Sequence, residues 1–163
     1  MPAPELAWEV RAADLWQRID QHTPEEFVTG MDTLCAELPP GSVVGLFERG
    51  AAQDSTGRPD LAVPLYQAAL DGGLGGLRRR RAVIQMASSL RNLGDAERAA
   101  ELLSAELHQP SDELDGAVRA FLALALVELG REREAVAISL LALSHYLPRY
   151  NRSLARYAQD LLA

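Results

Sequence analysis

The residues with the most evident chemical capability are four consecutive arginines at positions 78–81. A guanidinium group pairs bidentately with the oxygens of a carboxylate or phosphate. The run could therefore receive an acidic peptide, a C-terminal carboxylate or a phosphate. Four consecutive helical residues point in different directions around the helix axis, so at most two of these arginines can serve one surface.

The alternative to a ligand site is a solvated helix start, because the arginine run follows a glycine-rich segment, residues 72–76, and opens a predicted helix. Positive charge at that end of a helix opposes the helix dipole, so the run needs a partner, which the chain's own acids could supply. We assign Arg78, Arg79 and Arg80 to a predicted basic patch.

The other reactive side chains form no catalytic or metal-binding pattern. His22, His108 and His145 lie far apart in the sequence, and no motif for phosphate binding, serine hydrolysis or zinc proteolysis occurs. No carboxylate pair stands at a useful spacing from a histidine or a nucleophile. We therefore predict no catalytic residue, no metal site and no cofactor, and keep an enzyme of unknown class only as a remote alternative.

Composition indicates a helical protein. Alanine and leucine make up 53 of the 163 residues, and both favour helices. The chain has 16 arginines, no lysine and 23 acids, for a net charge of −7, which argues against nucleic acid and anionic membranes as partners. A single cysteine, Cys35, permits no internal disulfide. With no basic leader and no apolar run near the ~20 residues of a membrane helix, we predict a cytoplasmic protein.

Three glycines mark an internal repeat, because Gly57, Gly94 and Gly130 are 37 and 36 residues apart. A small residue stands seven positions before each glycine and an alanine five positions after it: Gly50, Ala87 and Ala123, then Ala62, Ala99 and Ala135. Small residues let two antiparallel helices approach closely, and glycine ends a helix in the left-handed conformation. The pattern predicts helix pairs joined at these glycines.

The predicted architecture is an N-terminal helical hairpin, residues 1–40, followed by a repeat domain, residues 41–163. The hairpin contains helices at 3–20 and 24–38, the second opened by the capping sequence of Thr23, Pro24 and Glu26. The helices expected in the repeat domain are 43–55, 60–71, 78–92, 95–108, 113–129, 132–146 and a terminal helix at 150–162.

These residues resemble the tetratricopeptide repeat family over roughly residues 43–163. The first repeat matches best, with Gly50, Gly57, Ala62, Tyr66 and Ala69. The third is weaker, because Ser139 stands where the pattern has a large residue. The segment from Leu46 to Leu93 is also similar to small bacterial proteins of a tetratricopeptide subgroup without known function. The resemblance implies an all-α fold, a right-handed superhelix of about three helix pairs, and a protein–protein interaction module.

The resemblance also implies a concave face, lined by the first helix of each repeat, that binds a peptide or a partner protein. The residues expected there are Glu48 and Asp54 from repeat one, Arg81, Gln85, Ser88, Arg91 and Asn92 from repeat two, and Phe121, Leu124 and Glu128 from repeat three. The polar stripe of repeat two predicts recognition of an acidic peptide, whereas a merely solvated face is the alternative.

Two parts of the chain allow more than one interpretation. The hairpin either covers the end of the first repeat or forms a homodimer, and self-association is the alternative function. The helix at 117–129 is apolar almost all round, so we expect the terminal helix to cover it; uncovered, it becomes a partner site. Residues 1–40 carry a net charge of −6 and residues 41–163 only −1, so the hairpin is itself a candidate partner for the arginines.

Overall fold

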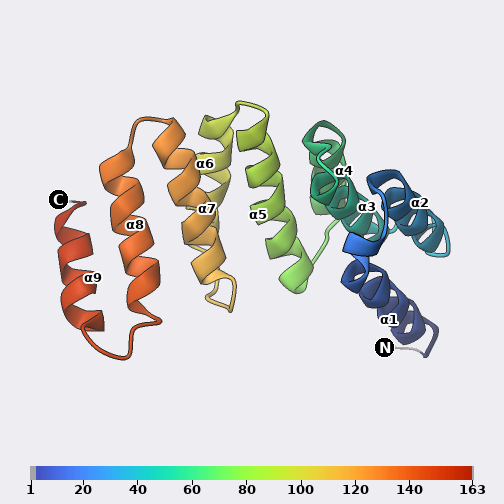
Figure 1. Cartoon of the computed structure of the whole chain (residues 1–163), viewed down its shortest axis with the longest axis horizontal. Helices are drawn as coiled ribbons and strands as arrows, with labels where there is room; N and C mark the ends of the chain where they lie inside the picture. The colour runs from blue at the N-terminus through green and yellow to red at the C-terminus, as the bar shows by residue number, and fades with distance from the viewer. Residues whose placement is uncertain (1–2, 163) are drawn as a thin grey trace. The chain divides into compact units, whose positions relative to one another are not determined.

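The computed structural model describes residues 3–162 and is helical throughout that part of the chain, with no strand (Figure 1). The elements, in chain order, are α1 (Ala3–Gln17), the 3-10 turn η1 (Ile19–Gln21), α2 (Pro24–Cys35), α3 (Val43–Ser55), α4 (Pro59–Asp71), α5 (Gly76–Asn92), α6 (Ala96–Glu106), α7 (Asp115–Glu128), α8 (Glu132–Ser144) and α9 (Asn151–Asp160). This confirms the all-α fold class. None of the described helices is both long and apolar enough to cross a membrane.

The seven helices of the repeat domain lie within two residues of their predicted bounds, because residues that end or start helices stand at their boundaries. Gly57, Gly94 and Gly130 all have positive φ, at 81°, 90° and 71°, the left-handed conformation that glycine adopts without a Cβ clash. After Gly94, the Asp95 side chain accepts a hydrogen bond from the Arg98 N–H at 3.1 Å and caps α6.

The hairpin helices are shorter than predicted. The capping box at Thr23 and Glu26 is present, but α2 ends at Cys35 rather than residue 38. Pro39 disfavours helical geometry at Leu38, and the residues before it form a turn in which the Glu37 and Leu38 N–H groups donate to the carbonyls of Leu34 and Cys35 at 3.3 and 3.1 Å. The first helix ends at Gln17, and the single turn of η1 replaces its predicted last residues.

The chain divides into two compact units, with residues up to Ala82 in unit 1 and residues from Val83 in unit 2. The boundary falls inside α5, so unit 1 combines the hairpin with the first repeat and the start of α5. The division at residue 40 and the right-handed superhelix stay predictions.

Unit 1 has an aromatic core shared by the hairpin and α3. The buried cluster consists of Trp8, Ala12, Phe27, Met31, Leu34, Cys35 and Ala52. The Trp8 Nε1–H donates to the Leu34 carbonyl at 2.8 Å and joins α1 to α2. A Cβ on Gly50 would lie 3.0 Å from ring atoms of Tyr66, so this glycine allows α3 and α4 to pack closely. The hairpin thus buries its apolar side within its own chain.

Unit 2 has an aliphatic core, in which one side of α7 is buried as expected: Val118, Leu122 and Leu126 are at most 2% exposed. The predicted cover of its other side by the terminal helix is wrong. Helix α9 packs against α8, where the Arg133 Nε–H donates to the Leu161 carbonyl at 2.9 Å. The side chains of Leu124 and Val127 therefore remain 48% and 51% exposed.

Candidate functional site

The first arginine of the run is neutralised inside unit 1. The guanidinium of Arg78 donates to both carboxylate oxygens of Glu9, at 3.0 and 2.5 Å, and its Nε–H donates to Glu48 at 3.1 Å. Glu9 lies on α1, so the acidic hairpin supplies a partner of the basic run, as the charge distribution suggested. Burial opposes the charge of Arg78, but hydrogen bonds and charge from Glu9 and Glu48 outweigh it, and its pKa is raised.

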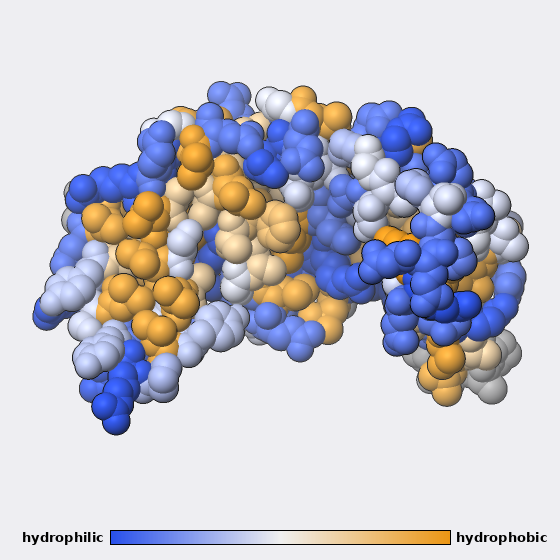
Figure 2. All heavy atoms as spheres, in the orientation of Figure 1, coloured by the Kyte–Doolittle hydropathy of each residue, from blue (hydrophilic) through white to orange (hydrophobic). Residues whose placement is uncertain are grey.

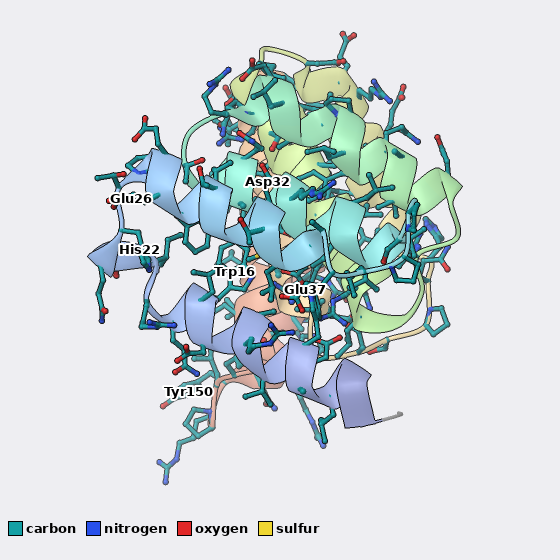
Figure 3. The ribbon with its side chains drawn as sticks, turned by 90° about the vertical axis from the view of Figure 1, so that its right-hand side faces the viewer. Trp16, His22, Glu26, Asp32, Glu37 and Tyr150 are labelled. Atoms are coloured by element: carbon teal, nitrogen blue, oxygen red, sulfur yellow. The ribbon has the colours of Figure 1, made fainter. Side chains whose placement is uncertain are left out.

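Glu48 lies in the interior rather than on a binding face. Its residue is 3% exposed, and its second carboxylate oxygen accepts a hydrogen bond from the Trp16 indole N–H at 2.8 Å. Trp16 lies between α1 and the neighbouring helices, as Figure 3 shows, with its ring edge-on to Phe27 at a centroid distance of 4.9 Å. Glu48 thus joins the hairpin to α5 and cannot contact a partner while unit 1 is folded.

The remaining arginines of the run point in different directions, as helical geometry requires. Arg80 is buried at 4% exposure, and Arg79 is partly buried. Arg81 is exposed, and its guanidinium carbon lies 5.1 Å from the ring centroid of Phe47, a cation–π contact. The run is therefore no continuous basic patch, because only Arg81 keeps an exposed side chain.

Asp54, on α3, lies beside the aromatic ring of Tyr66 on α4. The Tyr66 hydroxyl donates to its carboxylate at 3.5 Å. Burial first, and then the negative charge of Asp54, raise the pKa of Tyr66, so the phenol stays protonated. The position of Asp54 on α3 is thus explained by the packing of α3 against α4.

In unit 2 the structure brings together three of the predicted site residues. The guanidinium of Arg91 donates to Glu128 at 2.5 Å and to the side-chain oxygen of Asn92 at 2.9 Å. Arg91 and Asn92 end α5, and Glu128 ends α7. The ion pair is solvent-accessible, with side chains 23% and 39% exposed. Gln85 and Ser88 lie further back on α5 and are partly buried.

An apolar groove with a volume of about 430 Å³ lies between α7 and α8. One of its lining residues, Val127, directly precedes Glu128 in the sequence. Its lining is almost entirely hydrophobic: Ala120, Ala123, Leu124, Val127, Ala135, Val136, Ser139 and Leu140. Figure 2 shows hydrophobic residues gathered over α7 and α8 on the viewed face. We call this feature the α7–α8 groove.

Sequence reasoning found one member of this groove and missed others. Leu124 and Phe121 were both expected at binding positions. Leu124 is a groove residue, whereas Phe121 is partly buried. Val127 and Val136, each about half-exposed, were not selected. The stripe of Ala120, Leu124 and Val127, spaced four and three residues apart, is a signal that could have identified the α7 side. The α8 side depended on knowing where α9 packs.

The comparison with known families agrees with this geometry. Residues 43–161 match the family described as Tetratrico peptide repeat. Because the match covers well over half of the chain, the chain belongs to the tetratricopeptide repeat family. The family generally mediates protein–protein interactions, and its members are typically non-enzymatic scaffolds. Neither a curated protein nor a solved structure was found to match the chain.

Proposed function

We propose that the protein is an interaction module in which the α7–α8 groove of unit 2 binds an apolar side chain of a peptide segment. The observation that carries this proposal is the clustering of half-exposed apolar residues in one groove. Single exposed leucines are ordinary on protein surfaces, but a contiguous apolar strip with a polar rim is typical of interaction sites.

The energetics favour an apolar anchor. Burying a fully exposed leucine or valine side chain contributes about 1.5–3 kcal/mol. Covering Leu124, Val127 and Val136, which are 48%, 51% and 50% exposed, therefore contributes on the order of 1 kcal/mol each. Arg91, Asn92 and Glu128 form a solvent-accessible polar cluster in the same unit, and Glu128 directly follows the groove residue Val127 in the sequence. In this proposal the groove supplies affinity, and hydrogen bonds from the polar cluster orient the segment.

We do not propose that the arginine run at 78–81, or Arg91, selects acidic peptides. Arg78 and Arg91 already pair with carboxylates of this chain, and displacing those carboxylates would cost what a new acid contributes. Of the predicted concave-face residues, the proposal retains Leu124, Glu128, Arg91 and Asn92. The lone, buried Cys35 fits a reducing compartment, so we place this interaction in the cytoplasm.

Variants of equal exposure test the groove. Peptides selected from a displayed random library on the full chain serve as probes, and fluorescence polarisation measures their affinity. The double substitution Leu124→Ser/Val127→Ser is expected to weaken binding at least about tenfold, roughly the loss of 1.4 kcal/mol. The control Leu143→Ser alters an α8 residue that is also 48% exposed but lies outside the groove lining.

The control is expected to bind within about twofold of the wild type, and circular dichroism checks that both variants remain helical. Retention of affinity by the groove variant, or equal losses in both, would show that the segment binds elsewhere.

Self-association is the second candidate function, and the structure narrows where it can occur. The hairpin uses its apolar side against α3 in the same chain, which supports a capping role for that side. A homodimer built on the hairpin core would have to open unit 1. The surface charges of the two chain ends point to a different arrangement.

A further inference from the structure

Three arginines near the C-terminal end have no carboxylate partner among the residues that the structure describes. They are Arg149, Arg152 and Arg156, all exposed, within the α8–α9 turn and α9. The guanidinium of Arg156 lies 5.2 Å from the ring centroid of Tyr157 and makes no ion pair with a described residue. Residues 145–157 contain no acid. This corner therefore carries uncompensated positive charge, whereas Arg11, Arg78, Arg91 and Arg131 all pair internally.

The same corner exposes three aromatic side chains. Tyr146, Tyr150 and Tyr157 are 71%, 77% and 57% exposed, and tyrosine and arginine are the residues that most often dominate binding energy at protein interfaces. We call these three arginines and three tyrosines the basic corner.

Local energetics do not explain the basic corner. Arg152 lies in the first turn of α9, where positive charge opposes the helix dipole. Tyr150 has φ 65°, a left-handed conformation that costs a non-glycine residue roughly 1–3 kcal/mol. Residues that break local rules in this way are expected where function requires them.

A complementary acidic corner lies near the other chain end. Asp20, Glu25 and Glu26 are exposed, in η1 and the first turn of α2, and no arginine pairs with them among the described residues. Glu26 also holds the capping box, and its side chain points outward beside His22 in Figure 3. Residues 19–26 contain three acids and no arginine. We call these three acids the acidic corner.

We propose that copies of this chain associate, with the acidic corner of one copy docked on the basic corner of another. The contact pairs three carboxylates with three guanidinium groups, and the tyrosines contribute contact area around them. Two copies satisfy both contacts reciprocally in a two-fold dimer or add successively, so the assembly is identified by its dependence on these charges and not by its size. Exposed charges are screened within about 10 Å at 0.1 M salt, so the association is weak and salt-sensitive.

Sedimentation of the full chain over a range of concentrations tests the proposal. In about 0.05 M NaCl the average mass is expected to rise with concentration above that of the monomer, and in about 0.5 M NaCl it returns to the monomer mass. A wild type that stays monomeric in low salt, or that stops at a salt-resistant dimer, overturns the proposal.

Charge reversal then identifies the two surfaces. Arg149→Glu/Arg152→Glu and Asp20→Arg/Glu25→Arg are each expected to be monomeric, because each has two corners of like charge. An equimolar mixture restores opposite charges at both contacts and is expected to associate again. The control Glu97→Arg/Glu101→Arg alters two exposed α6 acids by the same total charge and keeps wild-type association.

Two outcomes contradict the assignment of the partner. If the mixture stays monomeric, the corners do not bind each other. If the wild type is monomeric but a fluorescent polyglutamate peptide binds it and loses affinity in the Arg149→Glu/Arg152→Glu variant, the basic corner serves an acidic partner instead of a second copy. Binding of library peptides to the α7–α8 groove is measured on the same variants, so failure of this proposal is separable from failure of the proposed function.

Discussion

The two compact units are built from similar helix pairs, but they use their charged and apolar residues in opposite ways. Unit 1 places a buried carboxylate, Glu48, between Trp16 and Arg78 and binds the hairpin through it. Its apolar side chains form an aromatic core. Unit 2 leaves Leu124 and Val127 about half-exposed, and its last arginines have no acidic partner among the described residues.

This difference shows that the most conspicuous charge in a sequence need not be the functional one. The arginines of the run at 78–81 are largely engaged in contacts within unit 1. Arginines 149, 152 and 156 are not consecutive and form a weaker sequence signal, yet they remain exposed without carboxylate partners among the described residues. We infer that the arginine run mainly stabilises the fold of unit 1, whereas the arginines near the end of unit 2 are available for interaction.

The comparison is tested most strongly by Glu48→Ala. Removing this carboxylate leaves the Trp16 indole N–H and the Arg78 guanidinium without an acceptor in a mostly buried site. We expect a loss of about 2–4 kcal/mol in the free energy of unfolding, measured by urea denaturation. The hydrogen bonds of Glu48 join the hairpin to α5. The lower free energy of unfolding is therefore expected to reflect destabilisation of unit 1.

The matched control is Glu37→Ala, which removes an ion pair with Arg11 between side chains 47% and 52% exposed. Exposed pairs contribute little, so the urea midpoint is expected to stay unchanged. Equal effects of the two substitutions would mean that Glu48 is not a buried link of unit 1.

Cys35 gives a reporter for unit 1 alone, because it is the only cysteine in the chain. Burial raises the pKa of its thiol from 9.0 to about 11, although Arg49 partly opposes this shift. A rise of two units lowers the thiolate fraction at pH 8 about a hundredfold. We expect native Cys35 to react with a thiol reagent at least about a hundredfold slower than in urea.

Labelling of the Glu48→Ala variant is expected to be faster than that of the wild type, since local opening becomes easier. Wild-type labelling at the unfolded rate would contradict a closed core in unit 1.

The smallest effect is a pH dependence from the capping box. Hydrogen bonding from the Thr23 backbone N–H, with a further contribution from the Thr23 hydroxyl, lowers the pKa of Glu26 below its usual 4.5. A carboxyl whose pKa is lower in the folded state contributes stability that is complete above the unfolded pKa and lost as the pH falls through the folded value. Between about pH 6 and pH 3, wild-type stability is therefore expected to fall more than that of Glu26→Gln. Parallel urea midpoints for the two proteins across this range would show that the capping carboxylate contributes nothing.

Local signals in the sequence predict the helices well and the site only in part. Gly57, Gly94 and Gly130 each end a helix because only glycine adopts positive φ there without strain, and Thr23 with Glu26 starts α2 for an equally local reason. Glu48 could not be assigned correctly, because its burial depends on Trp16 and Arg78, which lie 32 and 30 residues away in the sequence.

By itself, the sequence determined the helical class, the repeat period, the turns and the family, because these depend on spacing along the chain. Only the tertiary structure decided which charges remain available. Arg78 pairs with Glu9, which is 69 residues away in the sequence, and Arg91 pairs with Glu128, which is 37 residues away. It also decided that α9 rests on α8 and leaves the α7–α8 groove open. Pairing and coverage depend on the distances between folded elements, and spacing along the chain does not encode those distances.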